Sequence, residues 1–183
     1  MEPTNDDLGT PPEVINVINE FSGGILLDPC SNPWSTVGAK VSWGLKLDPP
    51  TDSLEVDWLH WSVEYAEENG LDENQRLIFV NPPYGRGFLP QWSSKVISEL
   101  FEAKDRIETL EMILLVPCSP DTNWYKELLR HSDAMCIWDK RIKFLTGKHG
   151  SGTFASTFFY FGHRKYLFAH HFSKHGDIRL RGM

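Results

Sequence analysis

The sequence has few cysteines, no long hydrophobic run and a deficit of positive charge. None of its apolar runs approaches the roughly 20 residues of a membrane-spanning helix, so we expect no membrane partner. The acidic start of the chain lacks the apolar stretch of a secretory signal. Cys30, Cys118 and Cys136 lie far apart and are odd in number. This pattern argues against a disulfide framework or a zinc site and favours free thiols in a cytoplasm.

The deficit of positive charge also bears on the choice of partner. The chain has 18 Lys and Arg against 25 Asp and Glu, a net charge of −7 at pH 7, which argues mildly against nucleic acid. The basic residues are clustered, however, at Lys140, Arg141 and Lys143 and again between Arg164 and Arg181. A basic face on an acidic protein is compatible with phosphate binding.

A length of 183 residues with 40% hydrophobic and 13% aromatic residues indicates one globular domain spanning 1–183. We expect residues 1–8 to be flexible. The sequence contains no internal repeat and no low-complexity tract. Nothing in it predicts the oligomeric state.

Short apolar runs alternate with segments of helical periodicity. We predict strands at 25–28, 41–43, 77–80, 112–116, 134–138, 141–145 and 154–161, and helices at 11–22, 62–69, 88–101, 121–130 and 166–173. The residues after 173 are expected to form a tail. This order predicts an α/β fold with a mostly parallel, doubly wound sheet that ends in a C-terminal antiparallel hairpin.

Two helix starts carry capping signals. Thr10 is predicted as the N-cap of the first helix, with Pro11 in the first turn and Glu13 completing a capping box. Gly23 then ends that helix. Asp121 is predicted to cap the helix that follows the strand at 112–116.

The most informative stretch is the strand at 77–80 followed by Asn81-Pro82-Pro83-Tyr84. The two prolines cannot donate to a sheet ladder, so the strand must end there. The tetrapeptide therefore lies at the carboxyl end of a strand, the edge where open α/β sheets bind ligands.

Asn-Pro-Pro-Tyr suits the activation of an amino group on a heterocycle, whose lone pair is delocalised into the ring. The carboxamide oxygen of Asn81 and the carbonyl oxygen of Pro82 can accept hydrogen bonds from the two N–H groups of this amine. The lone pair of the nitrogen is then free to attack a methyl group. Tyr84 offers a face on which a planar base can stack. The alternative is an ordinary proline-rich turn with a packed tyrosine.

Other polar residues have two interpretations each. Asp28 at the end of the first strand is either a pocket residue or the cap of the next turn. Asp52 is either a pocket contact or an exposed loop acid. His171 and His175 have the i, i+4 spacing of metal ligands, but no glutamate lies beside them, so we expect no metal there.

With these motifs the chain resembles the phage and prophage DNA N6-adenine methyltransferases, the Dam group of S-adenosylmethionine-dependent enzymes. The matching pieces occur in the expected order over nearly the whole chain. They are Thr10-Pro11-Pro12-Glu13, Leu27-Asp28-Pro29-Cys30-Ser31, Asp52-Ser53-Leu54 with Trp58, Asn81 to Gly87, Leu115-Val116-Pro117 with Asp121-Thr122-Asn123-Trp124, Arg141-Ile142-Lys143-Phe144, and Ala155-Ser156.

The resemblance implies a Rossmann-like methyltransferase fold, S-adenosylmethionine as cofactor and DNA as partner, in the cytoplasm of a bacterial cell with a phage or prophage gene. It implies that Thr10, Pro11, Asp28 and Pro29 bind the methionine end of the cofactor and that Asp52 lies near its ribose or adenine. It further implies that Asn81, Pro82 and Tyr84 bind the target amino group and its base. Phe144 would pack against the flipped adenine, and DNA phosphates would be bound by Lys140, Arg141 and Lys143.

The chain also departs from this family. The loop after the first strand has no glycine-rich turn, residues 59–76 look like an insertion, and no separate target-recognition domain is visible. Three alternatives stay open. They are methylation of cytosine N4, methylation of a protein glutamine, and a catalytically inactive DNA-binding relative.

Overall fold

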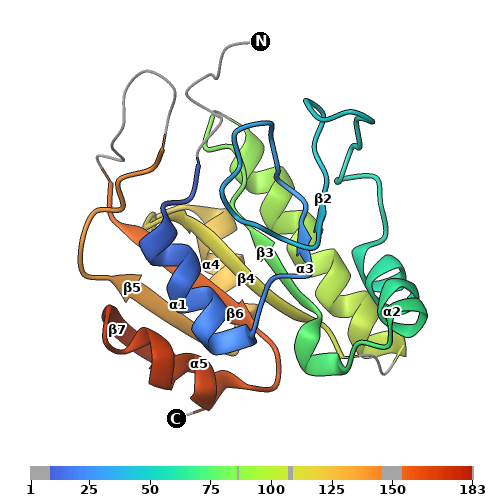
Figure 1. The fold of residues 1–183 in the computed structure, drawn as a ribbon. Coiled ribbons are helices and arrows are strands. Elements are labelled where there is room, and N and C mark those ends of the chain that lie inside the picture. Colours follow the sequence, from blue (N-terminus) through green and yellow to red (C-terminus); the bar gives the residue numbers. More distant parts are fainter. Residues whose placement is uncertain (1–8, 86, 107–108, 146–153, 183) are drawn as a thin grey trace.

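A single sheet forms the centre of the molecule (Figure 1). The computed structural model describes residues 9–85, 87–106, 109–145 and 154–182, and within these the seven strands have the order β2-β1-β3-β4-β6-β5-β7. The strands are β1 (Leu27–Asp28), β2 (Val41–Ser42), β3 (Leu77–Val80), β4 (Glu111–Pro117), β5 (Ala134–Trp138), β6 (Ser156–Phe161) and β7 (Gly176–Leu180). The helices are α1 (Pro12–Ser22), α2 (Trp58–Asn69), α3 (Phe88–Arg106), α4 (Asn123–His131) and α5 (Lys165–Phe172), with a 3₁₀ turn, η1 (Glu73–Gln75). Residues 1–8, which we expect to be flexible, lie outside the described residues.

The first five strands all point in one direction. β1 pairs in parallel with β2 and β3, and β3 pairs in parallel with β4. β5 has the same direction because β6 is antiparallel to both β4 and β5. The predicted α/β fold with a mostly parallel sheet is therefore confirmed, and it is compatible with a Rossmann-like fold.

The C-terminal part of the sheet is antiparallel. β6 lies between β4 and β5 and pairs antiparallel with both. The prediction of a tail after residue 173 is wrong, because β7 forms there and pairs antiparallel with β5. β7 was difficult to predict because it is an edge strand with no fully buried residue and two charged residues, Asp177 and Arg179.

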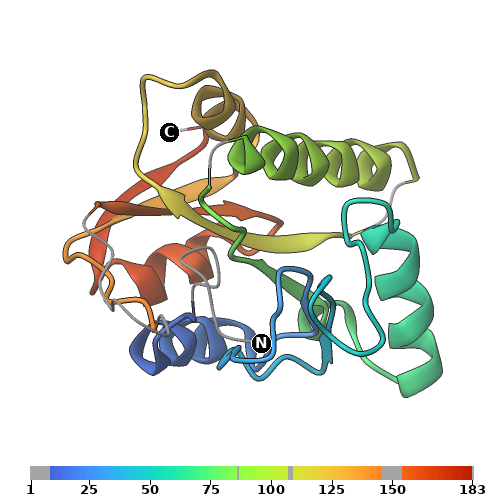
Figure 2. The same ribbon diagram turned by 90° about the horizontal axis from the view of Figure 1, so that it is seen from above.

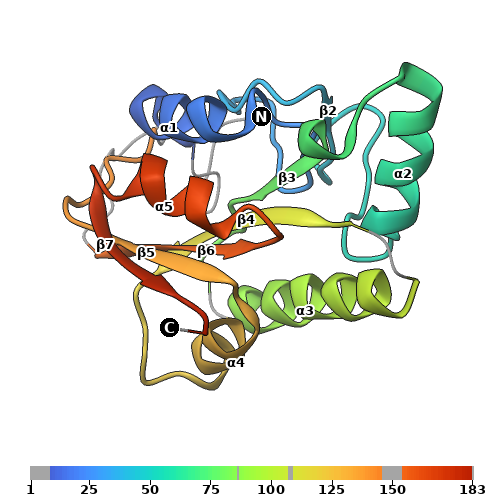
Figure 3. The same cartoon turned by 90° about the horizontal axis from the view of Figure 1, so that it is seen from below.

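Helices cover both faces of the sheet. Figure 3 shows α1 and α5 on one face and α3 and α4 on the other, and Figure 2 shows the same layering from above. α2 lies at one end of the molecule and packs against α3. Among the residues that the structure describes, no helix combines the length and the apolar character needed to cross a bilayer.

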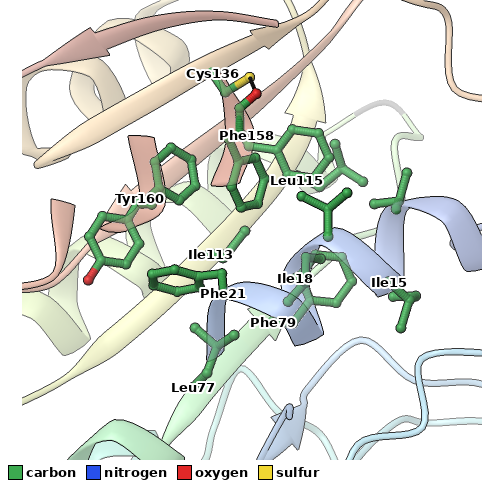
Figure 4. Packing of buried hydrophobic residues seen from close by; sticks show 14 of the residues in the cluster. Ile15, Ile18, Phe21, Leu77, Phe79, Ile113, Leu115, Cys136, Phe158 and Tyr160 are labelled. Carbon is green, nitrogen blue, oxygen red and sulfur yellow. Dashed lines mark hydrogen bonds between the residues drawn. The ribbon is translucent and has the colours of Figure 1, made fainter. Parts of the chain in front are cut away.

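The α1 face of the sheet is packed by residues at helical spacing. Ile15, Ile18 and Phe21 of α1 point at the sheet, where they meet side chains of β3, β4, β5 and β6 (Figure 4). Phe21 lies edge-on to Tyr160, with ring centroids 5.4 Å apart. Replacing a buried phenylalanine such as Phe79 by alanine would cost about 3–5 kcal/mol, so this layer holds the strand before Asn81 firmly.

The core on the α3 side also includes residues of α2, a helix that begins four residues earlier than predicted. The Asp57 side chain accepts a hydrogen bond from the His60 amide and caps the helix. The buried Glu99 carboxylate accepts from the amides of Trp58 and Leu59 and pairs with Lys95. Residues of the expected insertion 59–76 thus contribute to the core, since Leu59 is fully buried.

Three local predictions are wrong. The N-cap of α1 is Pro11, not Thr10, and the Pro11 side chain makes no capping hydrogen bond. The N-cap of α4 is Thr122, not Asp121. Residues 141–145 form no strand, and only an isolated bridge joins Leu145 to Gly9.

Candidate active site at the carboxyl edge of the sheet

The candidate site lies where the order of the strands reverses. From β1 the chain moves to β2 on one side, whereas β3 lies on the other side of β1 and leads on to β4. Leu27 of β1 pairs with Ile78 of β3, so the carboxyl ends of the two strands adjoin. Asp28 ends β1 and Asn81 follows β3. Ligands bind at such switch points in open α/β sheets.

Asp28 is a buried carboxyl group without a cationic partner. Its oxygens accept hydrogen bonds from the Cys30 amide, at 3.1 Å, and from the Ser35 hydroxyl, also at 3.1 Å. No ion pair involving Asp28 occurs among the residues described. Burial therefore raises the pKa of Asp28 to about 6. The hydrogen bonds lower this pKa, but they offset the effect of burial only in part.

The carboxamide of Asn81 is held from both sides. Its Nδ2 donates to the hydroxyl of Thr10 at 3.0 Å, and its Oδ1 accepts from the hydroxyl of Tyr84 at 2.8 Å. Both Asn81 and Thr10 are buried. The side chain predicted to cap α1 thus reaches across 71 positions of sequence to fix the orientation of Asn81.

Tyr84 packs against two phenylalanines that also contact each other. Phe144 and Phe154 lie edge-on to its ring, with centroids 5.8 and 5.4 Å away. The Tyr84 hydroxyl has a second acceptor in the carbonyl of Leu115, at 3.1 Å. Burial raises the pKa of Tyr84 well above its usual value, so this group stays a neutral donor. Phe144 is itself buried and supports Tyr84.

A cavity of about 320 Å³ opens beside this motif. The loop after β1 contributes Pro29, the segment after β2 contributes Asp52 and Ser53, and the start of α3 contributes Trp92. Its size falls within the range of small-molecule pockets, about 300–1,000 Å³. The buried Ser53 hydroxyl has no hydrogen-bond partner among the described residues, which leaves a polar group available to a ligand.

Of the predicted cofactor residues, only Pro29 and Asp52 line this cavity. Asp52 is exposed and accepts a hydrogen bond from the Leu54 amide, so it also shapes its own turn. Thr10, Pro11 and Asp28 are buried and do not line it, and Thr10 is hydrogen-bonded to Asn81 instead. The structure therefore brings the predicted residues to one edge but distributes them between a cavity and a hydrogen-bonded cluster.

Cys30 joins these two parts and was missed by the sequence interpretation. It lines the cavity, and the Asn81 amide donates to its sulfur. Burial and the neighbouring Asp28 raise the pKa of the thiol well above its usual value, so it is not a nucleophile at neutral pH. Its position directly after the strand-ending Asp28-Pro29 was the only available signal.

The backbone around the cavity depends on a close approach between two loops. The Ser31 amide donates to the Trp43 carbonyl at 2.8 Å. A Cβ at Gly44 would lie 2.0 Å from the Ser31 carbonyl oxygen, so only glycine allows this contact. The cavity wall is thus fixed by main-chain packing.

The predicted phosphate contacts lie outside the cavity. Lys140, Arg141 and Lys143 are exposed on the segment that follows β5. The histidines of the C-terminal region do not converge, because His175 stacks on Trp138 and His171 packs on Phe21. Burial lowers the pKa of His171. Within the described ranges no three metal-ligating side chains cluster.

Comparison of the chain with known proteins identifies no family for it. No known protein family matches the chain, and no curated protein matches it. The resemblance to the phage methyltransferases therefore rests on the motifs and their order alone, and the function has to be argued from the site.

Proposed function

We propose that this protein is an S-adenosylmethionine-dependent methyltransferase with a Rossmann-like methyltransferase fold that methylates the N6 amino group of adenine in DNA. The observation that carries the proposal is the oriented carboxamide of Asn81 at the carboxyl end of β3, across the switch point from the unpaired Asp28. A site of this kind has one polar group prepared for an amine and one prepared for a cation.

The residues present fit the proposed cofactor. Asp28 is a buried carboxyl that lacks a cation, and S-adenosylmethionine carries a cationic sulfonium and an ammonium group. A cavity of about 320 Å³ with the unpartnered Ser53 hydroxyl suits its nucleoside part. Asp28 would hold the methionine end, with Thr10, Pro11 and Pro29 around it, and Asp52 the ribose or adenine. When bound, the cofactor supplies an electrophilic methyl group.

Asn81 would accept one N–H of the adenine amine, and the carbonyl of Pro82 the other. The Tyr84 hydroxyl now donates to Asn81 Oδ1, in the place of such an N–H. Since the same hydroxyl also reaches the Leu115 carbonyl, it can give up Asn81 without losing its hydrogen bond. The arriving amine would therefore replace a neutral donor, at little cost in unmade hydrogen bonds.

Thr10 has a positioning role in this mechanism. By accepting from Nδ2 it turns Oδ1 of Asn81 toward Tyr84 and the target base. In methyl transfer from the bound cofactor the amine nitrogen would gain the methyl group, and its surplus N–H proton would leave to water. No strong general base is required, so the chain contributes position and two fixed acceptors.

The flipped adenine would stack on Tyr84, whose ring is kept in place by Phe144 and Phe154. Phe144 would act through Tyr84, since it is buried behind that ring. Lys140, Arg141 and Lys143 would meet phosphates of the same DNA strand.

The experiment is to express the protein in cells and map modified adenines in their DNA. N6-methyladenine in a defined sequence context supports the proposal. Hydrolysis of the same DNA to nucleosides separates the alternatives, because N4-methylcytosine or methylated protein glutamine would redirect the substrate assignment. DNA binding without any transferred methyl would identify a catalytically inactive relative.

A further inference from the structure

We infer that a second cleft, at the carboxyl end of β5, binds the phosphate backbone of the nucleic-acid strand that carries the target base. This inference rests on the proposed function, because it takes Tyr84 as the point where the base enters. The β5 cleft has a volume of about 410 Å³. It is formed by the start of α1, the segment after β5 and the turn between α5 and β7.

The charge of the β5 cleft is opposite to that of the whole protein. Four cations line it, against two carboxylates, in a chain with a net charge of −7. The cations are Lys140, Arg141, Lys143 and Lys174, and the carboxylates are Glu13 and Asp139. In the part of the chain that the structure describes, the three lysines form no ion pair. Their ammonium groups are therefore available to an anion.

The backbone holds these lysines in fixed places. Along residues 141–145 exposed and buried side chains alternate, and the buried Ile142 and Phe144 anchor the segment. Two backbone hydrogen bonds between Gly9 and Leu145 close its far end. Lys140 and Lys143 are thus presented by an ordered main chain, although it is not a regular strand.

Lys174 is brought to the same cleft from a distant part of the chain. The Asp139 amide donates to the His175 carbonyl at 2.9 Å, and Trp138 pairs with Gly176 across β5 and β7. A Cβ at Gly176 would lie 2.1 Å from the Ile137 carbonyl oxygen, so the two segments approach as closely as the backbone allows. Sequence analysis assigned no role to Lys174, because it lies in what was predicted to be a tail.

The aromatic rings of the β5 cleft are packed against other rings of the protein. Trp138 stacks on His175, with centroids 4.9 Å apart and planes at 6°, and it packs against Phe158 at 5.0 Å. Its ring therefore has little free surface for a nucleobase. Because the three lysines form no ion pair within the described residues and the aromatic rings are packed, the cleft suits phosphates, and its contribution should not depend on base sequence.

The β5 cleft and Asn81 lie on the same edge of the sheet. β5 is parallel to β3, and three strand-to-strand steps separate them in the order β3-β4-β6-β5. At a spacing of about 4.8 Å these steps amount to roughly 14 Å. With a rise of about 3.4 Å per nucleotide, the cleft would meet the strand about four nucleotides from the target adenine.

The test compares Lys140→Gln/Lys174→Gln with the control Lys104→Gln/Lys126→Gln, which removes the same charge from exposed positions on α3 and α4. Binding of fluorescent single- and double-stranded DNA is measured by anisotropy against salt concentration, and cofactor binding by calorimetry. We expect about tenfold weaker DNA binding for the first variant and a salt slope lower by about 1.5, in every sequence tested. Cofactor affinity should not change.

A second series varies the DNA. Oligonucleotides that extend one, two, four or six nucleotides on either side of a single adenine should lose the effect of the variant when neither side exceeds about three nucleotides. An equal effect of the control variant, or no effect on DNA of any length, would overturn the inference while leaving the methyltransferase proposal intact. Conversely, DNA binding that depends on the cleft in a protein that transfers no methyl would overturn the proposed function alone. Failure of the wild type to bind DNA would overturn the inference as well.

Discussion

The two edges of the central sheet treat buried charge in opposite ways. At the amino edge, Glu111 begins β4 and is fully buried, but Arg164 pairs with its carboxylate and Tyr160 donates to it. At the carboxyl edge, Asp28 is about as deeply buried, and among the described residues its hydrogen-bond donors are neutral. The first edge therefore satisfies its charge within the chain, and the second leaves its charge unsatisfied.

This difference separates structure from function. Arg164 also donates to the Asn74 carbonyl and lies over the Phe21 ring, so the amino edge ties α1 and η1 to the sheet. A buried carboxyl with a raised pKa and no cation is costly to the fold, and such groups cluster at functional sites. In our proposal, Asp28 and Asn81 therefore bind ligands, whereas Glu111 and Arg164 stabilise the fold.

The largest effect is expected for Asn81→Ala, which removes one of the two aimed acceptors. Loss of a comparable preorganised dipole raises the barrier by roughly 3–4 kcal/mol, so turnover should fall at least about a hundredfold. Unfolding in urea should show a loss of only about 1 kcal/mol, since Tyr84 keeps the Leu115 carbonyl as its acceptor. Wild-type turnover in this variant would remove the central role from Asn81.

The reverse result is expected at the other edge. Arg164→Met leaves the Glu111 carboxylate buried and unpaired, which should cost about 3 kcal/mol of unfolding free energy in a urea titration. Turnover per folded molecule should stay unchanged, because Glu111 is far along the strand from the site. A selective loss of turnover with unchanged stability would break the comparison.

Asp28→Asn should stabilise the protein and disable it. The pKa of Asp28 is raised from 3.8 to about 6, so the folded state loses stability as the pH rises from about 4 to 6, because the unfolded chain ionises there while the buried carboxyl stays protonated. The asparagine avoids this cost, and the gain should reach about 3 kcal/mol at pH 8 and shrink below pH 6. Urea unfolding at pH 8 and pH 5 measures both values.

The same variant tests the ligand assigned to Asp28. Binding of S-adenosylmethionine, followed by calorimetry, should weaken strongly in Asp28→Asn at pH 8. In the wild type, affinity should fall as the pH drops below 6, because the carboxyl becomes protonated. Unaltered cofactor affinity in the variant would show that Asp28 has no cation to bind.

The smallest effect is expected for Thr10. Thr10→Val keeps the packing but removes the partner of Asn81 Nδ2, which should lower kcat about tenfold, the value of one hydrogen bond. KM for DNA should change little, and Thr10→Ser should restore kcat because it keeps the hydroxyl. A defect in cofactor binding with normal kcat would return Thr10 to the role that the family resemblance implies.

The elements around the site were predictable because their signals are local. The apolar run before Asn81 and the two prolines after it specify a buried strand with a defined end, and β3 ends as expected. β7 could not be predicted, since an edge strand buries little and its pairing with β5 depends on a residue 40 positions away. The bond between Thr10 and Asn81 is equally non-local, and the capping signal at Thr10 pointed to the wrong partner.

The cavity was beyond sequence reasoning for a related reason. Its wall requires the loops after β1 and β2 to touch at Gly44, and its lining combines residues whose individual signals are weak, such as Cys30 and Ser53. Asp28 was recognisable as an acid at a strand end, but its lack of a cation is a property of the assembled fold.

The most direct measurement is a single-turnover assay with methyl-labelled S-adenosylmethionine, DNA and either the wild type or Asn81→Ala, followed by digestion to nucleosides. The account predicts label in N6-methyladenine with the wild type, appearing at least about a hundredfold more slowly with the variant. Label on another acceptor, equal rates for both proteins, or no transfer at all would contradict it.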